Sequence, residues 1–209
     1  MSDSDRDPAA CSRILREVEA ATPRECTAYL AGAAHDGTFS RLHNTIRISQ
    51  AVPAWLAVLQ AVIHRLGSRS WVYREGVRRV WVVESTFKVG SPLDVVTPAE
   101  KAAYARGYFD AEGGMPRNGD SRFYIQMTQK DHHDLQQVRE FLEDPGVRCG
   151  RIHNPSARVD PGYWRFYVLA RSHADFAARV GTWHPGKWPL LAARAGVTPG
   201  SGAESDPAP

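Results

Sequence analysis

Residues 97–113 read TPAEKAAYARGYFDAEG, and residues 22–37 read TPRECTAYLAGAAHDG. Both stretches open with Thr-Pro and carry a glutamate three positions after the threonine, which is the pattern of a helix start with a capping box. Both hold alanine and glycine close together, so two helix backbones can approach each other there. Both end at an acid, Asp36 or Glu112, followed by glycine, which commonly stops a helix. The chain therefore contains two related helices.

The same kinds of element follow each helix in the same order. A short strand ends in glutamine, Gln50 or Gln129, and an amphipathic helix comes next. Its apolar positions are Trp55, Leu56, Leu59 and Ile63 in the first copy and Leu135, Val138, Phe141 and Leu142 in the second. Two strand-like runs then follow, at 70–76 and 77–85 in the first copy and at 147–154 and 162–170 in the second. Each copy is thus predicted to be αββαββ, an α+β pattern with helices on one face of a mainly antiparallel sheet, and only the second adds a clear final helix, at 172–181.

The duplication divides the chain into predicted parts. They are an N-terminal extension (1–20), a first repeat (21–90), a linker (91–96), a second repeat (97–195) and a tail (196–209). The tail and residues 1–10 are rich in polar and small residues, so we expect them to be disordered, whereas 11–20 can form a short helix. The linker is too short for independent domains, so we expect one rigid unit and a monomer.

Composition excludes several classes of protein. The chain has 209 residues, a formal net charge of +3 and 43% apolar residues, which suits a globular protein. No apolar run is long enough for a membrane helix, and no secretory signal opens the chain, so we expect no membrane partner and a cytoplasmic location, nucleoid-associated in a bacterium. Cys11, Cys26 and Cys149 are too few and scattered for a disulfide framework or a cysteine zinc site.

At the two motifs the sequence resembles the LAGLIDADG homing endonuclease family. Residues 105–113 (ARGYFDAEG) fit its nine-residue motif in full register, and residues 30–37 (LAGAAHDG) keep its start and its end but are one residue short. Residues 180–191 (VGTWHPGKWPLL) are similar to the late His-Pro-x-Lys signature of the family, so the resemblance runs from about Thr22 to Leu191. It implies two pseudo-symmetric repeats that form a saddle of antiparallel sheets, with the motif helices paired at the interface.

The resemblance implies a metal site where the two motif helices end. Asp36 and Glu112 are then ligands of Mg²⁺ (or Mn²⁺), one acid for each DNA strand cut, because helix C-termini that carry acids attract a cation. Asp110 lies two positions before Glu112 and therefore points to a different face of the helix. We expect it at the helix surface or in the interface, and a role as a second metal ligand is the weaker alternative. His35 and the pair His132-His133 are expected at the surface or in packing, since no zinc spacing surrounds them.

Supporting catalytic roles are implied for two glutamines and two lysines. Gln50 and Gln129 either position water in the active site or cap the following helix, and the residues leave both interpretations open. The resemblance places Lys187 near the phosphate under attack, with Lys88 as its counterpart in the first repeat.

Basic side chains are concentrated in and beside the predicted strands. Arg47 alternates with Ile46 and Ile48, which indicates one sheet face on the helices and one in solvent. A basic, curved sheet face fits the major groove of DNA, although a solvated surface explains the composition alone. The predicted DNA contacts are Arg41, His43, Arg47, Arg74, Arg78, Arg79, Arg122, Lys130, Arg148, Arg151 and Arg165.

These features predict a metal-dependent, site-specific endonuclease of homing type, acting on a long, partly asymmetric double-stranded DNA target. One alternative is a catalytically weak or inactive protein of the same fold, either a DNA-binding regulator or an RNA-splicing maturase with RNA as partner. The other is an unrelated α+β structural or interaction protein, which requires the duplicated motif to be a coincidence.

Overall fold

The first half of the chain folds in the predicted order. The computed structural model describes residues 8–51, 53–77, 80–90, 94–116, 118 and 121–195. The elements are α2 (Pro23–Ala33), a short 3-10 helix η2 (Ala34–Asp36), β1 (Gly37–Ser40), β2 (Thr45–Gln50), α3 (Pro53–Arg65), β3 (Ser70–Arg74) and β4 (Trp81–Ser85). The four strands form an antiparallel sheet in the order β1-β2-β4-β3. The expected αββαββ pattern is therefore present in this half.

The second half repeats this order with weaker strands. It contains α4 (Pro98–Glu112), β5 (Gly113–Gly114), β6 (Gln126–Gln129), α5 (His132–Glu143), β7 (Trp164–Tyr167), η3 (Ala170–Ser172), α6 (His173–Arg179) and α7 (Trp188–Arg194). The strands pair antiparallel in the order β5-β6-β7. The strand predicted over 147–154 is wrong as a regular strand, because only the isolated bridges Cys149↔Val168 and His153↔Arg165 form. Gly150 lies in the middle of that run, and a glycine inside a strand weakens it.

The N-terminal extension begins earlier than expected. Helix α1 spans Pro8–Ala20, so the predicted disorder of residues 1–10 is wrong for residues 8–10, which are helical. Ala10, Ile14 and Val18 are buried and lie at helical spacing, which gives the helix one apolar face. Residues 1–7, the middle of the linker (91–93) and the tail 196–209 lie outside the described residues.

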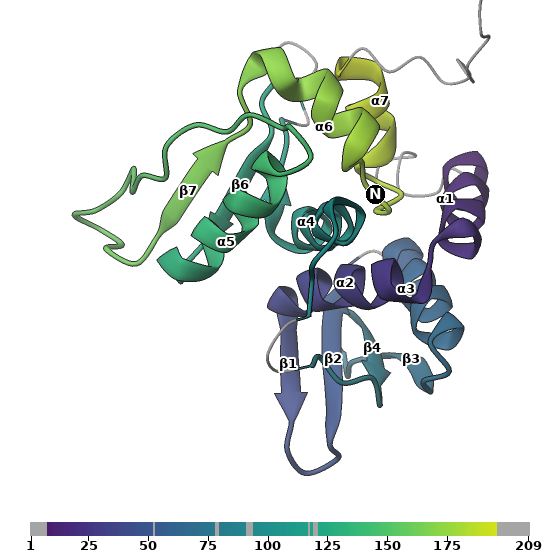
Figure 1. Ribbon diagram of the computed structural model, residues 1–209. Coiled ribbons are helices and arrows are strands. Elements are labelled where there is room, and N and C mark those ends of the chain that lie inside the picture. The colour runs from purple at the N-terminus through teal and green to yellow at the C-terminus, as the bar shows by residue number, and fades with distance from the viewer. Residues whose placement is uncertain are drawn as a thin grey trace, which may run out of the picture.

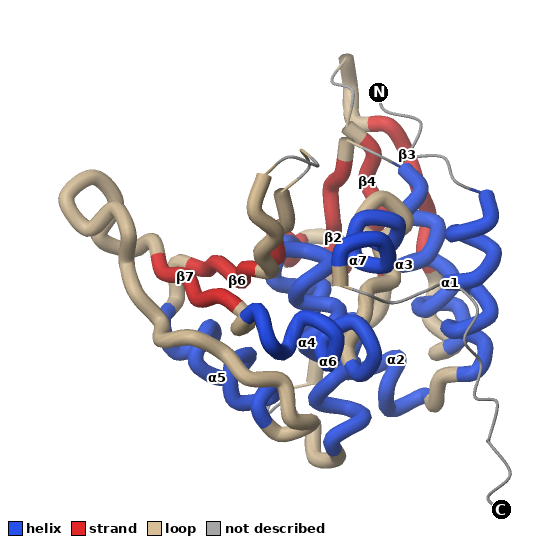
Figure 2. The backbone as a smooth tube through the Cα atoms, turned by 90° about the horizontal axis from the view of Figure 1, so that it is seen from above, coloured by secondary structure: helices blue, strands red, loops and turns tan. Residues whose placement is uncertain are grey.

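The two motif helices cross in direct contact, as Figures 1 and 2 show for α2 and α4. A Cβ added to Gly32 would lie 2.1 Å from the carbonyl oxygen of Tyr104, and one added to Gly107 would lie 2.0 Å from that of Tyr29. These contacts are mutual, since each glycine meets the tyrosine that precedes the other glycine. The crossing therefore has a two-fold character, and it explains why both motifs carry glycine at this position.

Each sheet packs one face on helices. In Figure 1 the first sheet lies below α2 and α3, while β6 and β7 lie beside α5. Ile46, Ile48 and Val83 of the first sheet face Leu30 of α2 and Ile63 of α3. Arg47 pairs with Glu84 of β4 on the opposite face, as strand alternation requires. Among the described residues, no helix is long and apolar enough to cross a membrane.

An ion pair joins the first turns of the two motif helices. Arg24 donates to Glu100 from Nε (2.6 Å) and from Nη2 (3.2 Å), and Glu100 also accepts the backbone N–H of Val96 at 2.8 Å. The hydrogen bond from Arg24 is the main cause that lowers the pKa of Glu100 to about 2. The stabilisation from this group is therefore complete above a pH of about 4.5, its ordinary pKa, and is lost as the pH falls through about 2.

We expect the Glu100→Gln variant to unfold with a free energy lower by about 1 kcal/mol at neutral pH, since it loses the ion pair with Arg24, whereas glutamine at this position still completes the capping box. The matched control is Glu25→Gln, which makes the same change in the capping box of α2, where the Glu25 carboxylate accepts the backbone N–H of Thr22. Denaturant unfolding of both variants at pH 7 and near pH 3 measures the effect. Equal losses in the two variants, or a difference that does not shrink in acid, would contradict this role of Glu100.

Candidate active site at the ends of the motif helices

The two motifs reach their acids by different helix endings. Helix α4 is α-helical up to Glu112, whereas α2 stops at Ala33 and continues as the 3-10 helix η2 to Asp36. A 3-10 helix rises about 2.0 Å per residue and an α-helix about 1.5 Å, so three residues of the first advance as far as four of the second. The tighter ending thus compensates for the residue that the first motif lacks.

Strand register matches the two acids and the two glutamines. Gly37, directly after Asp36, pairs with Ile48 of β2, and Gly113, directly after Glu112, pairs with Met127 of β6. Gln50 and Gln129 each lie two residues beyond the paired strand residue, on the same face. The acids and glutamines therefore occupy equivalent positions in the two halves.

Asp36 and Glu112 are half-buried and lie in one electrostatic environment. Burial raises the pKa of Asp36, while a hydrogen bond from Gln50 and the charge of Lys187 lower it. Burial also raises the pKa of Glu112, the charge of Asp36 raises it further, and Lys187 opposes both. Two carboxylates that disfavour each other's charge favour a cation between them.

The residues fit a magnesium-type ion. Among the described residues, no group of three or more His, Cys, Asp or Glu side chains is arranged to hold a metal, so a zinc-like site is not present there. Mg²⁺ keeps several waters and takes one or two carboxylates together with substrate phosphates. Asp36 and Glu112 would supply this donor set if a Mg²⁺ ion were bound at the two helix ends.

The glutamines differ in their contacts. Gln50 Nε2 donates to Asp36 Oδ2 at 2.6 Å, so it orients the acid. Gln129 Oε1 accepts the backbone N–H of Lys130 at 2.7 Å, while Asp131 is the N-cap of α5. Gln129 is therefore not the helix cap, and its side chain also forms a hydrogen bond with Tyr108 of α4.

Lys187 is held against the end of α4. Its Nζ donates to the carbonyl oxygens of Phe109 (2.5 Å), Asp110 (2.9 Å) and Gly113 (2.8 Å). A cation at a helix C-terminus stabilises the orphan carbonyls and the dipole of the helix. The His-Pro-Gly-Lys turn brings this lysine to the acids, and its His184 ring stacks on Trp55 of the first half at 5.4 Å.

Asp110 lies in the interface between the halves and not at the acid pair. It is buried and accepts hydrogen bonds from Tyr29 Oη (2.8 Å), from the backbone N–H of Trp183 (2.9 Å) and from the Thr182 hydroxyl. Burial raises its pKa to about 6. These contacts give no support to Asp110 as a second metal ligand.

His35 is the counterpart of Asp110 in the first motif, because Tyr29 and Tyr104 are equivalent. The Tyr104 hydroxyl lies 2.6 Å from His35 Nε2, and Asp134 of α5 lies 3.7 Å from Nδ1. Each motif tyrosine therefore bonds the residue near the end of the other motif. The expected packing role agrees with this contact.

The structure does not bring Lys88 to the acids. Its Nζ bonds the backbone and side-chain oxygens of Asn44 (2.7 Å for Oδ1), at the turn between β1 and β2. Asp36 and Gln50 lie at the other end of this hairpin. The expectation that Lys88 is the counterpart of Lys187 is therefore wrong. Lys88 is bound at the hairpin turn of the first half, whereas Lys187 lies on a segment that the first half lacks.

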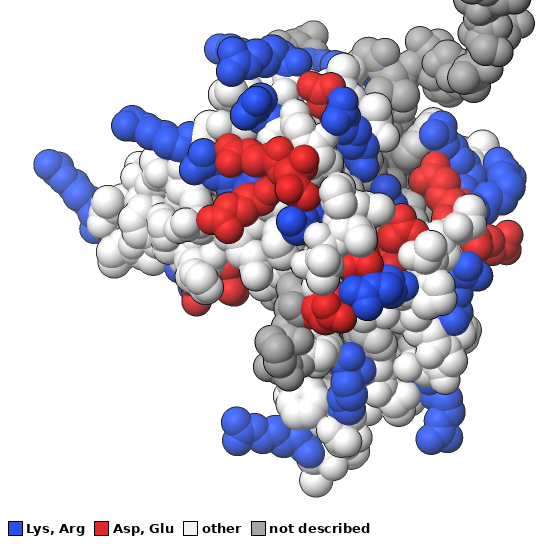
Figure 3. All heavy atoms as spheres, viewed as in Figure 1, with Lys and Arg blue, Asp and Glu red and all other residues white. Residues whose placement is uncertain are grey.

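Most of the predicted DNA contacts lie at the surface. Arg41, His43, Arg74, Arg122, Lys130, Arg148 and Arg151 are exposed, and Arg47 and Arg165 are half-buried. Arg78 and Arg79 lie outside the described residues. On the face shown in Figure 3, basic side chains project at the lower end of the first sheet and at the left tip, whereas acidic side chains gather around α5.

Sequence reasoning missed the neutral and acidic residues of the sheet faces. Arg47 donates to Tyr73 and Glu75, and Tyr73 donates to Glu84. In the second sheet Gln126 pairs with Tyr167 at the equivalent place. Strand alternation was the available signal, because residues two apart along a strand share one face of the sheet.

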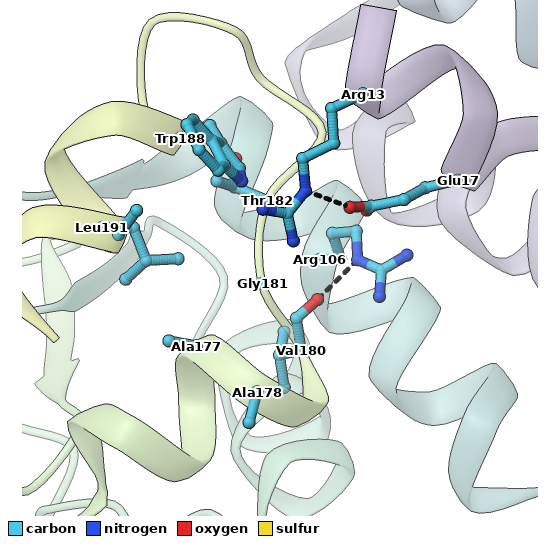
Figure 4. A pocket seen from close by; sticks show the side chains of 11 residues that line it. Arg13, Glu17, Arg106, Ala177, Ala178, Val180, Gly181, Thr182, Trp188 and Leu191 are labelled. Atoms are coloured by element: carbon cyan, nitrogen blue, oxygen red, sulfur yellow. Dashed lines mark hydrogen bonds and ion pairs between the residues drawn. The ribbon is translucent and has the colours of Figure 1, made fainter. Parts of the chain in front are cut away.

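A cavity of about 200 Å³ lies apart from the acids, where α1, α4 and the C-terminal helices meet. In Figure 4 Arg13 pairs with Glu17 (3.0 Å), and Arg106 donates to the carbonyl oxygen of Val180 (2.5 Å). The indole of Trp183 also donates to Glu17 at 3.1 Å. Helix α1 is therefore tied to the C-terminal part of the second half.

The chain is similar to known proteins in part of its sequence and in its fold. Residues 99–181 match the model of the LAGLIDADG-like domain. The structure is similar to I-DmoI in complex with DNA and Mn, with a TM-score of 0.59 and 17% identity over 77% of this chain and 98% of that chain. It is also similar to full-length DUF199/WhiA from Thermatoga maritima, with a TM-score of 0.64 and 15% identity over 87% of this chain and 65% of that chain. The N-terminal LAGLIDADG domain of DUF199/WhiA gives a TM-score of 0.62 and 17% identity over 82% of this chain and 91% of that chain. No curated protein matches the sequence significantly.

Residues 99–181 therefore match a LAGLIDADG-like domain, and the two halves together have the two-motif fold of I-DmoI. The predicted α+β class and the predicted resemblance are confirmed. This fold is shared with the homing endonuclease I-DmoI, whose structures were solved with DNA and Mn, Mg or Ca.

Proposed function

We propose that this chain is a site-specific DNA endonuclease of homing type, which cleaves phosphodiester bonds of double-stranded DNA with a divalent metal held by Asp36 and Glu112. The observation that carries the proposal is the equivalence of the two acids. Each ends its motif helix, each precedes a strand-pairing glycine, and the charge of Asp36 acts on Glu112. One acid from each half suits a substrate with two strands.

Each residue has a defined task in the reaction. A bound Mg²⁺ or Mn²⁺ supplies positive charge that makes water a better nucleophile and stabilises the leaving oxygen. Gln50 orients the Asp36 carboxylate through its 2.6 Å hydrogen bond. Lys187 fixes the end of α4, and its charge opposes the rise in pKa that burial causes at both acids. For each strand, the water oxygen bonds to phosphorus, the ester bond breaks, and the leaving oxygen takes up a proton.

Cleavage with metal and DNA tests the proposal. The protein is incubated in Mg²⁺, Mn²⁺ or EDTA with a duplex library that contains the sequences flanking its own gene. We expect double-strand cuts with short 3′ overhangs at one site in either metal and none in EDTA. Sequence-selective binding without cleavage in both metals would contradict the nuclease proposal.

Binding is expected to weaken steeply with salt, because basic side chains that neutralise phosphates release counterions. A protein with six to ten phosphate contacts loses about 10³ to 10⁵ in affinity between 50 and 200 mM salt. Affinity for one labelled duplex, measured across that range, gives the slope. An affinity that barely changes would count against DNA as the partner.

DNA binding without cleavage is the second candidate. The likeness to DUF199/WhiA is as high as that to I-DmoI, so the shared fold does not by itself assign cleavage. The cleavage experiment separates the two candidates, since selective binding in both metals without cuts favours the second.

A further inference from the structure

Arg47 is held in one place on the open face of the first sheet. Its Nε donates to Tyr73 Oη at 3.0 Å, and its Nη2 donates to Glu75 Oε1 at 2.8 Å. Arg47 lies on β2, Tyr73 on β3, and Glu75 directly after β3. The two hydrogen bonds that Arg47 donates to separate residues fix both the position and the plane of its guanidinium group.

A buried carboxylate supports this arrangement from below. Glu84 of β4 accepts hydrogen bonds from Tyr73 Oη (2.9 Å) and Thr45 Oγ1 (2.6 Å). Its side chain is 9% exposed, whereas that of Arg47 is 32% exposed. Because Tyr73 donates its hydroxyl hydrogen to Glu84, its oxygen accepts the hydrogen bond from Arg47. Arg47 and Glu75, whose side chain is 41% exposed, are the solvent-facing residues of the network.

The bonds to Tyr73 and Glu75 leave one edge of the guanidinium for a ligand. Arginine has five N–H donors, and the hydrogen bonds of Arg47 to described residues use Nε and one hydrogen of Nη2. The remaining hydrogens, on Nη1 and Nη2, form the end-on fork. A fork of this kind matches the O6 and N7 acceptors of guanine in the major groove.

The second half lacks this arrangement. Strand register matches Arg47 with Gln126 and Glu84 with Tyr167, which are neutral residues. The arginine of that sheet, Arg165, has a buried Nε without a partner among the described residues. The first sheet therefore presents an arginine that is fixed by hydrogen bonds, and the second sheet has no arginine fixed in this way among the described residues.

We infer that Arg47 is a pre-organised guanine-reading residue, and that Tyr73, Glu75 and Glu84 are its positioning residues. This inference rests on the proposed DNA-binding function and deepens it. A side chain already fixed in its bound geometry loses little rotamer freedom on binding, so it discriminates well between bases. Arg47 then specifies one G·C base pair in the half of the target that the first sheet covers.

Selection from a randomised duplex library in Ca²⁺ tests the inference, followed by affinity measurements on single-substitution duplexes. The key variant is Arg47→Lys, which keeps the charge but cannot form the fork. We expect it to lose about tenfold in guanine preference at one base pair, equivalent to about 1.4 kcal/mol, with the salt slope unchanged. Tyr73→Phe and Glu75→Gln are expected to weaken the preference at that same base pair.

The matched control is Tyr167→Phe, which makes the same chemical change on the second sheet, at the place equivalent to Glu84. It should keep the preference at the base pair that Arg47 governs. Preferences at all other positions report whether each variant is still folded. A guanine preference that survives Arg47→Lys, or an equal loss of affinity for every sequence, would overturn the inference. Full preference in both Tyr73→Phe and Glu75→Gln would overturn the positioning roles.

The inference and the proposed function fail in distinguishable ways. If the unaltered protein selects a sequence and cuts it while Arg47→Lys keeps every preference, only the inference is overturned. If the unaltered protein selects no sequence, both are overturned.

Discussion

The Asp36→Asn variant is expected to cleave both DNA strands at least about a thousandfold more slowly than the unaltered protein, and Glu112→Gln is expected to do the same. Removal of one charged ligand costs several kcal/mol of transition-state stabilisation, and each 1.4 kcal/mol is a factor of ten in rate. The two carboxylates lie close enough for the charge of Asp36 to raise the pKa of Glu112. Loss of either acid therefore affects the whole site.

Single-turnover cleavage of a duplex with each strand labelled separately measures this effect. DNA binding should persist in both variants, because the sheet faces are unchanged. Glu140→Gln is the control, since it removes the same charge from the exposed surface of α5. Cleavage of either strand at more than a tenth of the normal rate in both acid variants would exclude the acids as the metal site.

Gly32→Ala and Gly107→Ala are expected to give the largest losses of stability, about 3 kcal/mol or more each. Each added Cβ would lie 2.1 Å or 2.0 Å from a backbone carbonyl oxygen of the other motif helix. A flexible side chain could move away from such a contact, but a helix backbone cannot move without separating α2 from α4. The buried residues along this contact, among them Ala28, Ala103 and Tyr108, would then lose their partners.

Denaturant unfolding followed by tryptophan fluorescence measures both variants. Because the two glycines meet at one crossing, the double variant should lose less than the sum of the single losses. Gly162→Ala is the control, since its nearest neighbour atom lies 3.7 Å from the added Cβ. Unfolding of either motif variant at the normal denaturant concentration would show that the helices do not pack as described.

Much of the fold could be predicted from local patterns. The Thr-Pro-x-Glu starts form complete capping boxes on α2 and α4, because capping depends on residues within one turn. The strand-final glutamines could be aligned for a similar reason, since they stand at fixed distances from their strand and helix. The weaker strands of the second half could not be predicted, because whether a run such as 147–154 forms a regular strand depends on its packing against neighbouring strands.

The candidate site was only partly accessible from the sequence. Asp36 and Glu112 stood out through the motif, and the late signature singled out Lys187. The contact of Lys187 with three carbonyl oxygens of α4 was not foreseeable, because it joins residues far apart in the chain. The same holds for the acids around Arg47, since Glu75 follows β3 and Glu84 lies on β4.

The sequence by itself determined that the chain is a duplication, where each motif helix starts, and which acids end the helices, because these properties depend on spacing along the chain. Only the tertiary structure decided that the shortened first motif ends in a 3-10 turn that compensates for its missing residue. It also decided that Lys88 lies at a hairpin turn and that Arg47 is fixed by Tyr73 and Glu75. These outcomes depend on contacts between segments that are distant along the chain, and local spacing does not specify such contacts.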